Sequence, residues 1–310
     1  MNRSEYHKNT AESYKQIPAE FLLTRHEGMY STIDPRDTPG GCEVNSLGYR
    51  SPEFDGTAGL VTLGCSQTHG SGVQNGSNWP YLLAEKLDLK LANLAVVGSS
   101  IQAQLDVLLS YMNTYGRPKV VAFLAPNLER LRIPVRTDVI VASNKQEEPN
   151  TDYLYAAVHT NLEIRESNTE VIPSYAKKPY DMFDILPYEF AVAESIRALS
   201  HIGMICKVSG IRFVFASWHP ISNQYLSDLA NRLDPNTWEE LDMSNYVDVV
   251  SDEEFFKQYA NLDCHEDSLN VDGVAWAIGA DRTRHMGRHH HIHVAEAFYG
   301  KIQSSNEVNK

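Results

Sequence analysis

The stretch LVTLGCSQTHGSGVQNGSNWPYLLAEKL, residues 60–87, decides the fold class of this chain. It opens with a short apolar run that is typical of a buried strand, and the run ends abruptly in Gly64, Cys65 and Ser66. Small polar residues follow, and from Trp79 onward the apolar residues recur at helical spacing. A strand, a turn and a helix in this order predict an α/β unit with Ser66 at the carboxyl end of its first strand.

The same alternation continues along the chain. Further β-rich apolar runs lie at residues 90–97, 118–126 and 211–220, and helical patterns lie at residues 99–116, 187–210 and 290–303. Strands that alternate with helices predict a three-layer α/β sandwich with a central parallel sheet. Ligands of such sheets bind at the carboxyl ends of the strands, where Ser66, Asn127 and His219 all fall.

The 310 residues are expected to form one α/β domain with additions. Residues 1–56 are rich in turn formers and are interpreted as an N-terminal arm or cap, residues 57–303 as the α/β domain, and residues 304–310 as a polar tail. Two segments break the alternation. Residues near 128–180 are expected to form an inserted excursion with a polar, mobile tip, and the acidic and aromatic residues near 220–270 to form short helices over one edge of the sheet.

Composition excludes several classes of protein. The formal charge of −13 argues against a protein that neutralises nucleic-acid phosphates. No run of about eighteen apolar residues and no signal-peptide pattern is present, so we expect a cytoplasmic protein that does not bind membranes. The four cysteines are scattered without a Cys-x-x-Cys pair, which argues against a disulfide framework or a thiolate zinc site, and Cys206 is interpreted as a small buried hydrophobe.

Three strand-end residues could carry chemistry. Ser66 has the exposure and the neighbouring backbone N–H groups that a nucleophile needs, although many βα loops contain a serine with no such role. Gly98, after the second strand, and Asn127, after the third, could donate hydrogen bonds to an oxyanion. Each is an ordinary loop residue alone, and their shared position at successive strand ends is the stronger observation.

A histidine-rich segment precedes the last helix. It contains Asp281, His285, His289, His290, His291 and His293. One of these histidines could serve as the general base for Ser66. A metal site is a rival interpretation, since His289 and His293 are one helical turn apart, but no HExxH motif accompanies them. For most of the histidines we favour a solvated helix start, and we expect no metal or organic cofactor.

The blocks around these residues resemble the SGNH hydrolases, the GDSL-type esterases and lipases. LGCSQTHGSGV places Ser66 at that family's nucleophile position, NLAVVGSS places Gly98 at its second block, and APNLERL places Asn127 at its third. HMGRHHHIHVAEAF resembles the family's ending, in which the catalytic histidine precedes a glycine and the final helix, and this register selects His285. NSLGYR, residues 45–50, resembles a lead-in of related proteins from phages and bacterial polysaccharide loci.

The resemblance covers residues 45–127 and 270–300, and it implies the flavodoxin-like SGNH fold. Cys65 replaces the Asp that the family has before its nucleophile. Cys65 could itself be proposed as the nucleophile, but alternation along a strand points it inward, and a buried thiol without a cationic neighbour is inert. Ser66 is therefore preferred.

The second departure concerns the group that orients the base. The family has an Asp three residues before the histidine, whereas Asp281 precedes His285 by four positions and Arg282 stands at the family's position. A local bulge could still bring Asp281 to the imidazole, or a backbone carbonyl could orient it and leave a Ser–His dyad. Asp272 is a less favoured substitute.

The sequence thus predicts a serine esterase that hydrolyses a small or carbohydrate O-acyl ester, with an O-acetylated sugar as the first choice. The polar residues His69, Asn75 and Asn78 are expected to form a hydrophilic substrate rim. Two alternatives remain open: a non-catalytic binding or structural protein that retains the fold, for example in a virion or with a polysaccharide, and a metal-binding protein that uses the histidine tract. The sequence does not predict an oligomeric state.

Overall fold

The structure is a computed structural model that describes residues 44–71, 73, 76–96, 98–136, 153–159, 188–232, 241–250 and 286–307. Asp281, His285 and Asn75 lie outside the described residues, as do residues 1–43 of the expected arm and the tip of the first insertion.

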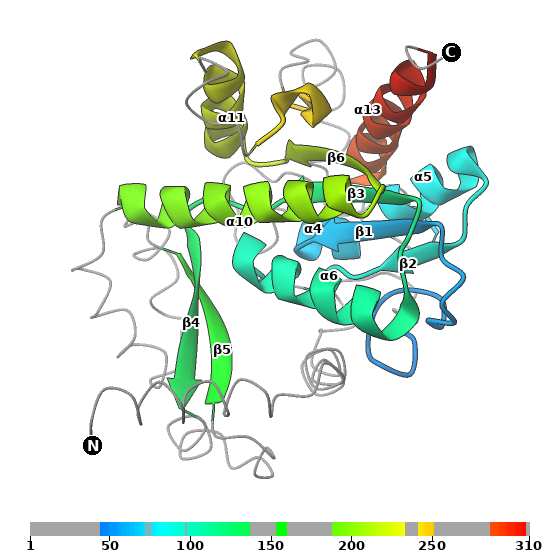
Figure 1. The fold of residues 1–310 in the computed structure, drawn as a ribbon, viewed down its shortest axis with the longest axis horizontal. Helices are drawn as coiled ribbons and strands as arrows, with labels where there is room; N and C mark the ends of the chain where they lie inside the picture. Colours follow the sequence, from blue (N-terminus) through cyan, green and yellow to red (C-terminus); the bar gives the residue numbers. More distant parts are fainter. Residues whose placement is uncertain are drawn as a thin grey trace.

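A parallel sheet of four strands forms the centre of the described structure (Figure 1). Its strands, in spatial order, are β2 (Leu91–Asn93), β1 (Leu60–Gly64), β3 (Val120–Ala125) and β6 (Arg212–Ser217). Each lies inside one of the runs from which a strand was predicted. Every residue of β1 and β3 is buried, as expected for central parallel strands with both faces covered. The α/β class and the parallel sheet are confirmed.

Helices cover both faces of this sheet (Figure 1). The helices are α5 (Trp79–Leu87), α6 (Ile101–Tyr115), α10 (Tyr188–Val208) and α13 (Arg288–Glu307). Val61 and Leu63 of β1 belong to the buried cluster that includes α6 and α10, and Leu60 belongs to the cluster that includes α5 and α13. On the second face the rings of Trp79 and Phe298 lie 5.1 Å apart. Alternate residues of one strand therefore face two helical layers, and the three layers are as predicted.

The first insertion contains strands that were not predicted. β4 (Arg130–Arg136) and β5 (Tyr153–His159) form an antiparallel pair that extends away from the main sheet (Figure 1). Pro134 lies inside β4, and proline is unusual within a strand unless the strand is at an edge, so the sequence signal was weak. The second insertion does contribute helices, namely α11 (Pro220–Arg232) and the short η2 (Met243–Asn245).

The described part of the expected arm packs into the core. Tyr49 is fully buried, and the ring of Phe54 lies 5.4 Å from those of Tyr49 and Tyr111 and 5.7 Å from that of Tyr115. Residues 44–56 therefore pack against α6 of the α/β domain, and the contacts of Tyr49 and Phe54 hold the segment VNSLGYRSPEF, residues 44–54, in place.

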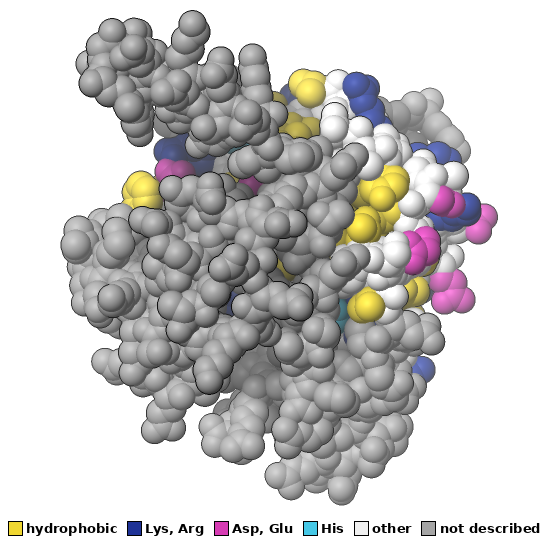
Figure 2. Space-filling model, turned by 90° about the horizontal axis from the view of Figure 1, so that it is seen from below, with side chains coloured by type: hydrophobic (Ala, Val, Ile, Leu, Met, Phe, Trp, Pro, Cys, Tyr) yellow, Lys and Arg dark blue, Asp and Glu magenta, His cyan; other side chains and the backbone are white. Residues whose placement is uncertain are grey.

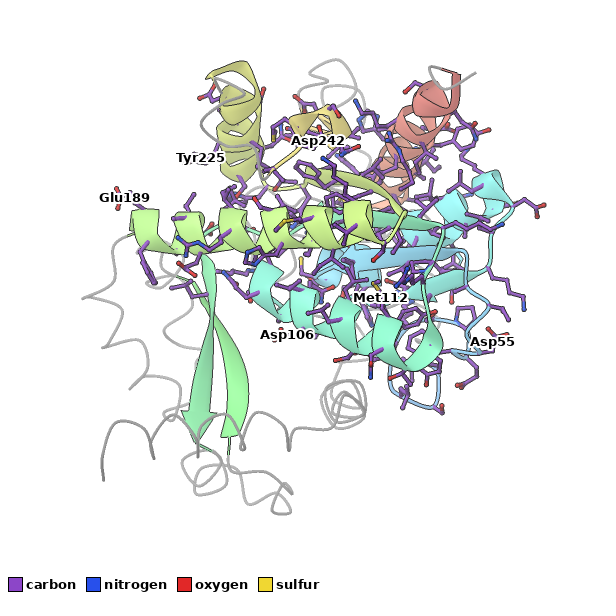
Figure 3. The ribbon with its side chains drawn as sticks, viewed as in Figure 1. Asp55, Asp106, Met112, Glu189, Tyr225 and Asp242 are labelled. Atoms are coloured by element: carbon purple, nitrogen blue, oxygen red, sulfur yellow. The ribbon has the colours of Figure 1, made fainter. Side chains whose placement is uncertain are left out.

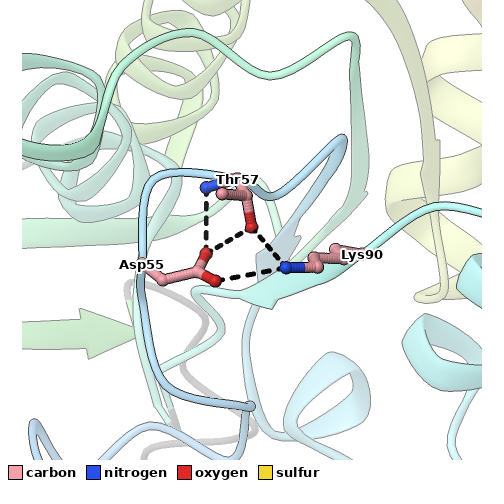
Figure 4. A network of polar contacts seen from close by, with 3 residues as sticks. All are labelled: Asp55, Thr57 and Lys90. Carbon is pink, nitrogen blue, oxygen red and sulfur yellow. Dashed lines mark hydrogen bonds and ion pairs between the residues drawn. The ribbon is translucent and has the colours of Figure 1, made fainter.

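A small polar network joins this segment to the amino end of the sheet (Figure 4). The Asp55 carboxylate accepts hydrogen bonds from the Thr57 hydroxyl at 2.6 Å and the Thr57 backbone N–H at 2.9 Å, and Lys90 Nζ lies 3.3 Å from its second oxygen. The Thr57 hydroxyl and N–H, and after them Lys90, lower the pKa of Asp55 to about 2. The three residues are exposed, so this network adds little to the free energy of folding.

On the face seen in Figure 2, charged side chains of the two signs are not separated. In Figure 2 the described part of one face carries acidic, basic and apolar side chains side by side. Figure 3 shows Glu189 and Asp242 at the periphery, while side chains fill the space between the helices and the sheet. Among the described helices, none is long and apolar enough to cross a membrane.

Candidate active site

Ser66 lies where β1 turns directly into a short helix. Gly64 ends the strand with φ +155°, and a Cβ there would lie 2.0 Å from Thr68 Oγ1 and 2.8 Å from the Leu124 carbonyl oxygen. Only glycine fits this close approach. Helix α4 (Ser66–His69) therefore begins immediately at the strand end, and it leaves Ser66 partly exposed at the carboxyl edge of the sheet.

Cys65 has the buried position that was predicted for it. Its side chain is 0% exposed, and its carbonyl accepts hydrogen bonds from the N–H groups of Thr68 (3.1 Å) and His69 (2.9 Å). A reagent or substrate at the sheet edge would meet Ser66 and not the Cys65 thiol. The geometry thus favours serine over cysteine as the nucleophile.

Gln104 of α6 joins the end of β1 to the loop that carries Gly98. Its Oε1 accepts from the Gly64 N–H at 3.0 Å, and its Nε2 donates to Ser99 Oγ at 3.1 Å. The Ser99 hydroxyl in turn donates to the Gly64 carbonyl at 3.1 Å. Sequence reasoning missed both residues, because a glutamine inside an amphipathic helix carries no signal of its partner.

Gly98 itself adopts a conformation that favours glycine. Its φ is +73°, and a Cβ there would meet no atom within 4 Å. The positive φ, and not close packing, is therefore the reason for a glycine at this position. Open space lies beside it. This open space leaves room for a ligand beside Gly98, as its proposed role at an oxyanion requires.

Asn127 reaches the same edge through the register of the sheet. Gly64 pairs with Leu124 of β3, so Ser66 lies two residues and Asn127 three residues past this pair on neighbouring strands. Asn127 is 2% exposed, and its Nδ2 donates to Glu129 Oε1 at 2.9 Å. Its Oδ1 accepts no hydrogen bond within the described structure.

His219 extends this edge beyond β6. Ala125 pairs with Ser217, so His219 and Asn127 each lie two residues past paired positions. His219 Nδ1 lies 3.4 Å from Ser222 Oγ, which accepts from the Leu128 N–H at 3.1 Å. Residues after all four strands therefore gather at one edge, as the alternation predicted.

Two of the residues expected to form a polar rim are buried instead. His69 and Asn78 are both 0% exposed, and Asn78 Nδ2 donates to the His69 carbonyl at 3.0 Å, which leaves neither side chain on an open surface. Asn78 does occupy the N-cap position of α5, but its side chain does not cap that helix. Asn75, the third expected rim residue, is not among the described residues.

Arg50 holds the backbone that follows α4. It is 1% exposed, and its guanidinium donates to the carbonyl oxygens of Gly70 and, at 2.7 Å, Val73. The NSLGYR lead-in is thereby given a structural role, because its last residue holds the loop that follows α4. The sequence alone does not predict this role for Arg50.

The histidine tract is largely interior. His290 and His291 are 3% and 0% exposed, and His291 Nδ1 accepts from the Trp79 N–H at 3.1 Å, at the start of α5. The expectation that most of these histidines are solvated is wrong for the part described, because this face of α13 packs on α5. His289 and His293 are half-buried. Within the described residues, no group of three His, Cys, Asp or Glu side chains could hold a metal ion.

The chain that follows His285 contacts the residue that follows Ser66. The Met286 N–H donates to Gln67 Oε1 at 2.8 Å, and both residues are buried. Asp281 and His285 themselves lie outside the described residues. The hydrogen bond between Met286 and Gln67 joins residues that are 219 positions apart, and it connects the chain just before α13 to helix α4.

Comparison with known proteins supplies no family for this chain. No protein-family profile matches the sequence, and no curated protein matches it. Any assignment of function therefore depends on the residues and the geometry described above.

Proposed function

We propose that this protein is a serine hydrolase of the SGNH type that cleaves a small or carbohydrate O-acyl ester. The observation that carries the proposal is the placement of Ser66 at the carboxyl edge of β1, flanked by Gly98 after β2 and Asn127 after β3. The hydrogen bond between Met286 and Gln67 adds support, since it brings the chain next to His285 toward the nucleophile helix.

In the first half of the proposed reaction, Ser66 Oγ attacks the ester carbonyl carbon. A bond forms between Oγ and that carbon, and the hydroxyl proton passes to His285. The N–H groups of Ser66 and Gly98 and the amide of Asn127 stabilise the negative charge on the carbonyl oxygen. The bond to the alcohol oxygen then breaks, His285 gives its proton to that oxygen, and an acyl-enzyme remains.

In the second half, water reverses these steps. Its oxygen attacks the acyl carbon while His285 takes one proton, and the bond to Ser66 Oγ then breaks as the proton returns to the serine. Asp281, a backbone carbonyl or, less favourably, Asp272 would orient the imidazole. The reaction needs no metal or organic cofactor.

The substrate class rests on fewer observations. His69 and Asn78 are buried and therefore do not form a hydrophilic rim. The preference for an O-acetylated carbohydrate is now supported by the likeness of NSLGYR to a motif of polysaccharide-locus proteins.

A fluorophosphonate probe tests the proposal. An activated Ser66 would form a bond to phosphorus, expel fluoride and give its proton to His285, and mass spectrometry would locate the adduct. We expect an adduct on Ser66 that is absent in Ser66→Ala and strongly slowed in His285→Ala. Folded wild-type protein that forms no adduct would refute the proposal and favour a binding or structural protein.

A further inference from the structure

A buried carboxylate lies beside the proposed oxyanion donor and has no part in the mechanism above. Glu129 is 1% exposed, and its Oε1 accepts from Asn127 Nδ2 at 2.9 Å. An ionised carboxylate is costly to bury unless it is hydrogen-bonded. The bond from Asn127 couples this carboxylate directly to the proposed oxyanion donor.

The chemistry of the two groups determines how the amide is turned. A carboxylate only accepts hydrogen bonds, whereas an asparagine amide has a donor end and an acceptor end. Glu129 therefore selects the orientation in which Nδ2 faces it. The reversed amide would place Oδ1 against the carboxylate, and the repulsion between two acceptors would oppose that orientation. One N–H of Asn127 is then used by Glu129, and the second remains to donate elsewhere.

We propose that Glu129 is a positioning residue that holds the Asn127 amide with its second N–H available to the acyl oxygen. This inference rests on the proposed serine-hydrolase function. Without Glu129, the amide could rotate by half a turn and present Oδ1 to the oxyanion, where an acceptor would repel the developing charge. Glu129 acts through Asn127 and does not itself touch the substrate.

The backbone around Glu129 gives it a fixed position. The Arg130 N–H donates to the Asn127 carbonyl at 3.1 Å, which closes a tight turn around Glu129. On one side of this turn, Arg130 Nη1 donates to the Ser99 carbonyl at 3.3 Å, next to Gly98. On the other side, the Leu128 N–H donates to Ser222 Oγ at 3.1 Å. The same turn thus supports the Asn127 amide and the loop of the second proposed donor.

The test measures the second-order rate constant for labelling of Ser66 by the fluorophosphonate probe. Removal of one oxyanion donor costs about 10²–10³ in rate, so we expect a loss of that order in Asn127→Ala. We expect Glu129→Ala to lose about tenfold or more, since the amide is then free to reverse. Glu129→Gln has both an acceptor and a donor end and can face either end of the Asn127 amide, so we expect a loss smaller than that of Glu129→Ala but greater than about threefold. Glu85→Ala, an exposed glutamate on α5, is the matched control and should label at the wild-type rate.

A double-mutant cycle separates positioning from a general structural effect. If Glu129 acts through Asn127, adding Glu129→Ala to Asn127→Ala slows labelling no further. If Glu129→Ala does not fold, Glu129→Met removes the acceptor with a similar side-chain length and takes its place. Melting temperatures of all variants confirm that folded proteins are being compared.

The outcomes distinguish this inference from the proposed function. Labelling of Ser66 in wild type together with unchanged labelling in Glu129→Ala overturns the positioning role and leaves the hydrolase intact. An equal loss from Glu129→Ala in the wild-type and Asn127→Ala backgrounds also overturns it. Failure to label Ser66 in folded wild-type protein overturns the proposed function, and the role of Glu129 with it.

Discussion

Replacing Gln104 with leucine tests whether one buried side chain holds the candidate site together. The wild-type side chain is 0% exposed and makes two hydrogen bonds, to the Gly64 N–H at 3.0 Å and to Ser99 Oγ at 3.1 Å. Leucine has a similar volume but no polar atoms, so the substitution removes both bonds with little change in packing.

The expected loss of stability depends on the groups that are left behind. The Gly64 N–H would be buried without an acceptor, which costs about 1–3 kcal/mol. Ser99 Oγ would keep its own donation to the Gly64 carbonyl, so its lost bond costs only about 0.5–1.5 kcal/mol. We expect a total of about 1.5–4.5 kcal/mol, or a fall in Tm of about 3–9 °C at roughly 2 °C per kcal/mol for a large domain.

The same substitution should slow the labelling of Ser66. Ser99 follows Gly98, and a looser loop would weaken the hydrogen bond of the Gly98 N–H to the phosphonyl oxygen. Half of the ~3 kcal/mol that one oxyanion donor contributes corresponds to about tenfold in rate. Differential scanning calorimetry and timed labelling measure the two effects on the same sample.

Gln102→Leu is the matched control for this experiment. Gln102 lies on the same helix, its Oε1 makes no hydrogen bond within the described structure, and its Nε2 makes only a long bond of 3.3 Å to Ser195. We expect a loss of less than about 1 kcal/mol and unchanged labelling. If Gln104→Leu behaves like Gln102→Leu in both assays, the proposed link between β1 and the Gly98 loop is refuted.

Three further predictions use other parts of the structure. His291→Ala leaves the Trp79 N–H without its acceptor, so we expect thermal unfolding to show a loss of about 1–3 kcal/mol that His291→Asn partly recovers. We also expect EDTA to leave the Tm of the wild-type protein unchanged, and a fall in Tm would support the metal-binding alternative. The pKa of Asp55 is lowered on folding, so its contribution to stability is complete above about pH 4 and is lost as the pH falls toward 2; a carboxyl NMR titration with a midpoint near 4 would contradict this. Cys65 and Cys206 are buried, and burial raises the pKa of Cys206 to about 12. We therefore expect neither thiol to react with iodoacetamide at pH 8 in the folded protein, which peptide mass spectrometry measures.

The elements of the main sheet were predictable because each produces its own local pattern. The four apolar runs gave β1, β2, β3 and β6, and the helical spacing in residues 290–303 gave α13. Parallel order was also predictable, since helices separate the strands. Once the strand ends were predicted, they were enough to place Ser66, Gly98 and Asn127 at one edge of the sheet.

The antiparallel pair β4 and β5 was not predictable in the same way. The segment between them spans residues 137–152, which is far longer than a hairpin turn, and Pro134 interrupts the first strand. The pairing of the two strands is a long-range contact that leaves no turn signal in the sequence.

The burial of the histidine tract was missed for a related reason. Four polar residues at the start of a helix are usually exposed, and nothing in the tract shows that the backbone of Trp79 needs an acceptor there. The bond between His291 and Trp79 joins residues that are 212 positions apart. Only the packing of α13 on α5 reveals it, and the same holds for the bond between Met286 and Gln67.

The two ends of the central sheet differ in how they treat polar groups. At the amino end, the network of Asp55, Thr57 and Lys90 is exposed to solvent. At the carboxyl end, the polar side chains that join the loops are at most 5% exposed, and they are Gln67, Ser99, Gln104, Asn127, Glu129 and Ser222. Polar groups in the interior lower stability unless every one is hydrogen-bonded, so apolar residues would serve better if the loops needed only to be packed. A buried polar network instead fixes the directions of N–H and C=O groups, which packing alone does not. The concentration of such groups at the edge that carries Ser66 is therefore expected of a site that must present donors in set directions, and this supports a catalytic interpretation over a merely structural one.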